Sequence, residues 1–164
     1  MMQKKVQIIS DGSLDLSQEL TKEKDIEVVP FYVSFDSETY QKEMVEVGVR
    51  EFYQEMVDHP TVFPKTSMPS VHDYYEVFEK HAKEQLPVIC ICITRKFSGS
   101  LQSATTAKDM ILEEYPDAQI TVIDSTVNTV LQGLYVLEAC RLRDMGLEYQ
   151  QIVDALLPIR ETGR

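Results

Sequence analysis

Residues 88–93 read Val-Ile-Cys-Ile-Cys-Ile, an unbroken apolar run between polar neighbours. A strand that is apolar at every position is typical of a parallel sheet covered on both faces, because each side chain then meets a helix. Three other short apolar runs, at residues 6–9, 28–35 and 120–123, predict the neighbouring strands. These runs indicate that a buried parallel sheet organises the chain.

Amphipathic segments lie between the apolar runs, with apolar residues at helical spacing in residues 49–57, 70–81, 98–111, 129–145 and 148–157. Ser70 precedes an acid by three residues, as in a capping box, and Ser98 is expected to cap the next helix. Residues 158–164 lack the pattern of a packed element. Alternating strands and helices predict an α/β domain with a parallel sheet flanked by helices, in a Rossmann-like three-layer arrangement.

The charge and cysteine content exclude several classes of protein. Lys plus Arg number 16 and Asp plus Glu number 27, giving a net charge of −11, which argues against non-specific binding to nucleic acid or to anionic membranes. No apolar run could span a bilayer and no signal-peptide pattern is present, so we expect a cytoplasmic, non-integral protein. The three cysteines form neither a disulfide pattern nor metal-finger spacing, so we expect no metal.

Common catalytic motifs are missing from the sequence: no G-x-G-x-x-G, P-loop or G-x-S-x-G pattern occurs. Asp11 ends the first predicted strand, where a phosphoryl-accepting aspartate would lie, but an aspartate there also serves as a turn cap. A hydrolase or phosphotransfer enzyme using Asp11 or Ser98 remains an alternative. A regulatory interaction module, with its interface on the acidic segment 36–58, is a second alternative.

Hydroxyl side chains gather where ligands bind to such sheets, at the carboxyl ends of the strands. Residues 64–70 and 95–100 each present hydroxyls just ahead of a predicted helix N-terminus, whose free N–H groups favour an anion. Two hydroxyl donors can bind a carboxylate without a metal or an arginine. Each serine taken alone is better explained as a helix cap, but the two segments together favour an anion site.

Four motifs in order resemble the N-terminal domain of the DegV family, bacterial fatty-acid-binding proteins of the FakB type. Residues 10–16 resemble its Asp-Ser-Thr turn after the first strand, and residues 65–70 its Lys-Thr-Ser-x-Pro-Ser run. Residues 98–104 resemble its Ser-Gly-Thr-x-Gln-Ser-Ala helix start, and residues 122–125 its Val-Ile-Asp-Ser strand end. The order and spacing agree over nearly the whole chain. One departure is Gly12, where the family usually has a serine.

The resemblance implies that residues 1–164 form an N-terminal domain followed by a second, C-terminal one. It implies a carrier without catalytic residues or cofactor, which binds a long-chain fatty acid such as palmitate and presents its carboxylate to a separate fatty acid kinase. The product would feed phospholipid synthesis, and transient membrane contact would accompany loading. The carboxylate ligands carried over by motif are Thr66 and Ser98. Secondary ligand-site candidates in the same motifs are Asp11, Ser13, Ser67, Gly99, Ser100, Asp124 and Ser125.

Overall fold

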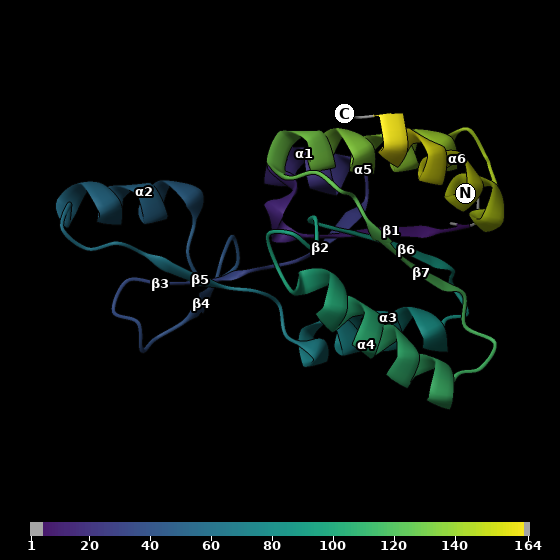
Figure 1. The fold of residues 1–164 in the computed structure, drawn as a ribbon, viewed down its shortest axis with the longest axis horizontal. Coiled ribbons are helices and arrows are strands. Elements are labelled where there is room, and N and C mark those ends of the chain that lie inside the picture. Colours follow the sequence, from purple (N-terminus) through teal and green to yellow (C-terminus); the bar gives the residue numbers. More distant parts are fainter. Residues whose placement is uncertain (1–4, 163–164) are drawn as a thin grey trace.

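A four-stranded parallel sheet forms the centre of the computed structural model, which describes residues 5–162 (Figure 1). The strand order is β2-β1-β6-β7, and all three pairings are parallel. The bounds are β1 (Gln7–Asp11), β2 (Ile26–Val29), β6 (Val88–Cys92) and β7 (Ile120–Asp124). The predicted parallel sheet is therefore confirmed.

Helices cover both faces of this sheet, which confirms the predicted three-layer arrangement (Figure 1). Helices α5 and α6 lie on one face with α1 beside them, and α3 and α4 lie on the other. The bounds are α1 (Gln18–Glu23), α3 (Val71–Lys83), α4 (Ser100–Glu114), α5 (Thr129–Asp144) and α6 (Tyr149–Thr162).

Strand β6 is buried at every position because each face of the sheet has its own apolar layer. Ile89 and Ile91 pack in the cluster under α5 and α6. Cys90 and Cys92 pack in the cluster under α3 and α4, with their Sγ atoms 3.8 Å apart. Burial raises the pKa of the Cys90 thiol, so this sulfur is not poised as a nucleophile. The interpretation of both cysteines as buried apolar residues is confirmed.

A second, small antiparallel sheet follows β2, and here one sequence prediction is wrong. Residues 28–35 do not form one strand: Pro30 and Phe31 separate β2 from β3 (Tyr32–Ser34), which belongs to the other sheet. Proline has no N–H for a ladder, so the chain changes sheets there. Strand β3 lies between β4 (Gln41–Lys42) and β5 (Lys65–Ser67), so part of the predicted 64–70 loop is a strand.

Helix α2 (Val49–Asp58) projects with the small sheet from the three-layer body (Figure 1). The helix predicted at residues 49–57 is confirmed, within the acidic segment 36–58. None of its residues is buried, although Phe52 packs against Phe35 with ring centroids 5.1 Å apart. Val49, Tyr53 and Val57 remain at least half exposed, so α2 carries an apolar surface that the described residues do not cover.

Asp73 joins the small sheet to α3. Its carboxylate accepts hydrogen bonds from the Ser70 backbone N–H at 2.8 Å and from the Tyr32 hydroxyl at 2.7 Å, while Lys42 Nζ lies 3.1 Å from it. Ser70 Oγ accepts from the Asp73 N–H, which confirms the predicted capping box. Burial opposes ionisation of Asp73, but these hydrogen bonds outweigh it and lower its pKa to about 2.

We expect Asp73→Ala to lower the free energy of unfolding by about 2 kcal/mol at pH 7, because the cap and the link to the small sheet are both lost. Since the pKa of Asp73 is lowered, its stabilisation is present above its ordinary value of 3.8 and is lost as the pH falls toward 2. Urea unfolding of both proteins at pH 7 and near pH 2 measures this. An equal difference in stability at the two pH values would contradict the role of the carboxylate.

Helix α6 extends further than the sequence predicts. It continues through Pro158 to Thr162, so residues 158–162 are helical, while Pro158 and Ile159 are exposed; residues 163–164 lie outside the described part. Thr126 Oγ1 donates to the Arg160 carbonyl at 3.3 Å, which ties this end to the turn after β7. Across residues 5–162, no helix has both the length and the apolar character needed to cross a bilayer.

Candidate functional site

The strand order reverses its direction at the carboxyl ends of β1 and β6. The chain leaves β1 toward β2 on one side, while β6 pairs with β1 on the other, so the connections diverge at this point. Ligands of open α/β sheets bind at such a divergence. Asp11 ends β1 here, the loop from Ile93 to Gly99 follows β6, and the N-termini of α4 and α5 approach the same edge.

Asp11 is the centre of a buried hydrogen-bond network at this edge and is itself fully buried. One carboxylate oxygen accepts from the Ser100 hydroxyl at 2.7 Å and from the Ile93 N–H at 2.9 Å. The other accepts from the Ser13 hydroxyl at 2.6 Å and from the Gln132 amide at 2.8 Å. Asp11 therefore ties β1 to the loop after β6 and to two helix N-termini, which is consistent with the turn-cap interpretation.

Two members of this network were not singled out as site residues by the sequence analysis. Gln132 is fully buried in α5, and its amide nitrogen donates to Asp11 and to Ser10 Oγ. Its carbonyl oxygen lies 2.9 Å from Ser13 Oγ and can only share the single hydroxyl hydrogen that Ser13 donates to Asp11. The Tyr74 hydroxyl lies 2.6 Å from Ser100 Oγ. A polar residue on the apolar face of a predicted helix was the available signal for Gln132, because buried amides need partners.

Ser98 lies half-buried at the start of α4, but it is not the helix cap that the sequence predicts. The cap position is Gly99 and the helix begins at Ser100, whose hydroxyl is engaged by Asp11. The Ser100 N–H donates to Ser98 Oγ at 3.1 Å. Within residues 5–162, the Ser98 hydroxyl hydrogen has no acceptor, so it is available to a ligand oxygen.

Thr66 lies on β5, opposite Val33 on β3, and its side chain is exposed. The neighbouring Ser67 is also exposed and faces the other side of the small sheet, since successive side chains alternate. Met68 then reaches the loop before α4: a Cβ on Gly99 would lie 2.6 Å from Met68 Sδ. The flexible end of Met68 would have to shift to admit a side chain at position 99, and its contact with Gly99 brings the two hydroxyl segments predicted from sequence against each other.

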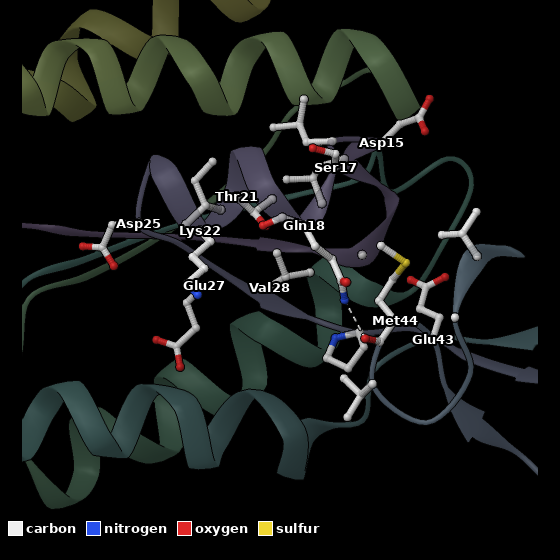
Figure 2. Close-up of a pocket in the computed structure, with 18 of the residues that line it drawn as sticks. Asp15, Ser17, Gln18, Thr21, Lys22, Asp25, Glu27, Val28, Glu43 and Met44 are labelled. Atoms are coloured by element: carbon white, nitrogen blue, oxygen red, sulfur yellow. Dashed lines mark hydrogen bonds between the residues drawn. The ribbon is translucent and has the colours of Figure 1, made fainter.

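A groove of about 1330 Å³ runs between the body and the small sheet (Figure 2). Thr66 lines it together with Val33 and Phe52, and the opposite wall includes Leu14 and Leu16. Ser98 does not belong to the lining. Figure 2 shows Glu43 and Met44 at one end, with Lys22, Asp25 and Glu27 toward the other. The groove thus combines apolar residues with a nearly equal number of polar and charged ones.

The remaining candidates, Asp124 and Ser125, form the turn after β7. Asp124 Oδ1 accepts from the Thr126 N–H at 2.9 Å, and Arg95 lies 3.7 Å from its other oxygen. Ser125 is buried and its hydroxyl donates to the Val127 carbonyl. These contacts stabilise the turn, and the structure does not bring either residue to Thr66.

Each histidine of the chain has a glutamate as its ionic neighbour: Glu55 for His59, Glu76 for His72 and Glu27 for His81. Within residues 5–162, no hydrogen bond links a histidine to a serine hydroxyl. In the part of the chain that the structure describes, hydroxyl donors therefore lie near the groove, and no serine hydroxyl is paired with a histidine as in a Ser-His-Asp triad.

The chain is similar to several known proteins. A family model described as uncharacterised protein, DegV family, matches residues 5–163. A DegV domain-containing protein of Clostridium acetobutylicum is 33% identical over 93% of this chain and 53% of its own length. The structure of a stearic-acid-binding protein from Eubacterium ventriosum is 46% identical with a TM-score of 0.88, over 92% of this chain and 52% of that one.

A second solved structure, described as showing fatty acid binding of a DegV family protein from Thermus thermophilus, is 29% identical with a TM-score of 0.79. The match covers 96% of this chain and 54% of that one. The chain thus spans about half the length of the relatives it matches.

Proposed function

Because the chain belongs to the DegV family, as its four motifs predicted, we propose that it binds a long-chain fatty acid whose carboxylate accepts hydrogen bonds from Thr66 and Ser98. The contact of Met68 with Gly99 supports this most directly, since it brings the two hydroxyl-bearing segments together. The stearic-acid-binding protein of E. ventriosum, at 46% identity, supports the class of ligand. In this proposal the ligand does not contact the Asp11 network, which instead positions the loop that carries Ser98 through Ser13 and Ser100.

The energetics of this binding favour an apolar tail with few polar contacts. Each buried methylene contributes about 0.8 kcal/mol, so a chain of about 16 carbons gains roughly 12 kcal/mol before the entropic costs of association. Hydroxyl and backbone N–H donors are sufficient for the head, because a hydrogen-bonded carboxyl does not need a cationic partner. No cofactor or metal enters this proposal.

A second domain would complete the binding site, as we propose from the apolar residues at the carboxyl edge of the sheet. Phe97, on the loop after β6, is 73% exposed, and three apolar residues of α5 are more than half exposed: Val130, Leu131 and Leu134. Exposed apolar surface of this kind marks a contact region. In this proposal residues 1–164 are the N-terminal half of a two-domain protein.

The role of such a protein is that of a carrier and not of a catalyst. The fatty acid, palmitate for instance, would be presented to a separate kinase that phosphorylates its carboxylate for phospholipid synthesis. This places the carrier in the cytoplasm, with transient membrane contact during loading. The buried position of Asp11, with both carboxylate oxygens occupied by donors, favours a positioning role over that of phosphoryl acceptor.

Solvent extraction of the purified full-length gene product, followed by mass spectrometry, tests the proposal. We expect one equivalent of a long-chain fatty acid per protein, which would also identify the preferred chain. Delipidated protein should take up added palmitate in a saturable way, without cleaving or activating it. An empty extract together with no uptake would refute fatty acid binding.

A further inference from the structure

Gly12 leaves a space that the side chain of Glu43 fills. A Cβ on Gly12 would collide with Glu43 Oε1, so the carboxyl group occupies the place where a side chain at position 12 would begin. The same oxygen accepts a hydrogen bond from the Phe31 N–H at 3.1 Å. Within residues 5–162, the second oxygen, Oε2, has no hydrogen-bond partner.

Glu43 and Thr66 face the same groove. Thr66 is the register partner of Val33 on β3, and the Glu43 N–H donates to the Phe31 carbonyl, two residues before Val33. Because side chains alternate along strands, Glu43, Val33 and Thr66 share one face of the small sheet. All three line the groove, and Figure 2 shows the Glu43 carboxyl within it.

The charges around Glu43 favour its neutral form. Glu43 is half-buried; burial raises its pKa, the Phe31 hydrogen bond opposes this, and the negative charge of nearby Asp11 adds to the increase. The other titratable groups on the groove walls near this end are Asp15, after the turn from β1, and Tyr53 of α2. Lys22, Asp25 and Glu27 lie at the far end of the groove (Figure 2). Lys80 and His81 each form an ion pair with Glu27, and Glu84 also lines the groove.

We propose that the protonated carboxyl of Glu43 donates a hydrogen bond from Oε2 to the carboxylate of the bound fatty acid, as a third polar contact beside Thr66 and Ser98. Two carboxyl groups in contact share one proton, because both cannot be ionised at close range without strong repulsion. The inference rests on the proposed function, since it requires the ligand head to lie at Thr66. Glu43 is thereby a determinant of specificity for a carboxylate over an uncharged head group.

The affinity for fatty acid should then decrease as the pH rises. Binding is at full strength below the pKa of Glu43 in the ligand-free protein, where Glu43 already carries its proton. As the pH rises above that pKa, the affinity falls by about tenfold per pH unit until the pKa of the complex is reached. Hexadecanol, whose hydroxyl can donate to ionised Glu43 or accept from the neutral form, shows no such fall.

Equilibrium dialysis of labelled palmitate against the delipidated full-length protein between pH 5 and pH 8.5 tests this proposal. The isosteric variant Glu43→Gln keeps a donor at every pH, so its affinity should stay constant where that of the wild type falls. Glu38→Gln removes the same charge from an exposed position and should retain the wild-type profile. Palmitate itself titrates and aggregates in the same way in all three experiments, so these effects do not distinguish the proteins.

A second variant, Gly12→Ser, tests the proposal even if Glu43→Gln does not fold. Gly12→Ser should displace the flexible end of Glu43 and supply its own hydroxyl, so its palmitate affinity should also become independent of pH. Identical pH profiles in the wild type, Glu43→Gln and Gly12→Ser would overturn the role of Glu43. Failure of the wild type to bind palmitate at any pH would instead refute the proposed function.

Discussion

Replacing Asp11 by alanine is expected to lower the free energy of unfolding by roughly 3–5 kcal/mol. The substitution removes the acceptor of four donor groups, on half-buried Ser13 and on the buried residues Ile93, Ser100 and Gln132. Each unsatisfied donor carries a desolvation cost, because the Asp11 side chain is fully buried. The loss should extend to both helix N-termini, because Asp11 is their common partner.

Urea unfolding followed by circular dichroism measures this effect. Asp11→Asn keeps the size of the side chain, but its amide NH₂ replaces one carboxylate oxygen and faces groups that are themselves donors. Its stability should therefore lie between that of the wild type and that of Asp11→Ala. Asp117→Ala is the matched control: Asp117 is exposed in the loop before β7, and its removal should change stability by less than about 0.5 kcal/mol. Equal stabilities of Asp11→Ala and Asp117→Ala would refute the central role of the Asp11 network.

The double variant Thr66→Ala/Ser98→Ala is expected to bind palmitate at least roughly 100-fold more weakly, because a hydrogen bond to a charged group contributes about 1.5–3 kcal/mol. Ser98→Ala also removes the acceptor of the Ser100 N–H, so the free energy of unfolding should fall by about 1 kcal/mol, which leaves the protein folded. The affinity for hexadecanol should fall much less, since the lost donors serve the carboxylate. Equilibrium dialysis with both ligands in the full-length protein measures the difference.

Two conservative variants serve as controls for this prediction. Thr66→Ser keeps the hydroxyl and should bind palmitate nearly as well as the wild type. Ser67→Ala removes a hydroxyl from the opposite face of the same strand and should have no effect. Unchanged palmitate affinity in the double variant would mean that the carboxylate lies elsewhere, even if extraction shows a bound fatty acid.

The elements that were predicted correctly are those whose pattern depends on local periodicity. Strand β6 is apolar at every position because it is covered on both faces, and Ser70 and Asp73 show their capping box within four residues. The error at residues 28–35 has a different cause. Both halves of that segment are genuine strands, but Pro30 ends the ladder and the second half pairs with β4 and β5 instead of β1.

The site was predicted only in part. Motif resemblance pointed to Thr66, Ser98 and Asp11, but it did not separate side chains that face the groove from those that support it. Asp11 is fully buried and Thr66 is exposed, although both lie in equally plain polar motifs. The signal for Gln132 was only a polar residue on an apolar helix face, and Glu43 belongs to no recognisable pattern. Gln132 acts on Asp11, which is far away in the chain, and Glu43 fills a space left by a distant glycine.

By itself, the sequence determined the three-layer α/β class, the family, the Ser70 cap and every helix except α1, because hydrophobic periodicity and short motifs are local properties. Only the tertiary structure decided that the chain changes sheets at Pro30, that Asp11 binds two helix N-termini together, and that Met68 meets Gly99. These contacts join residues far apart in the chain, and their geometry follows from how whole layers pack, which no local pattern encodes.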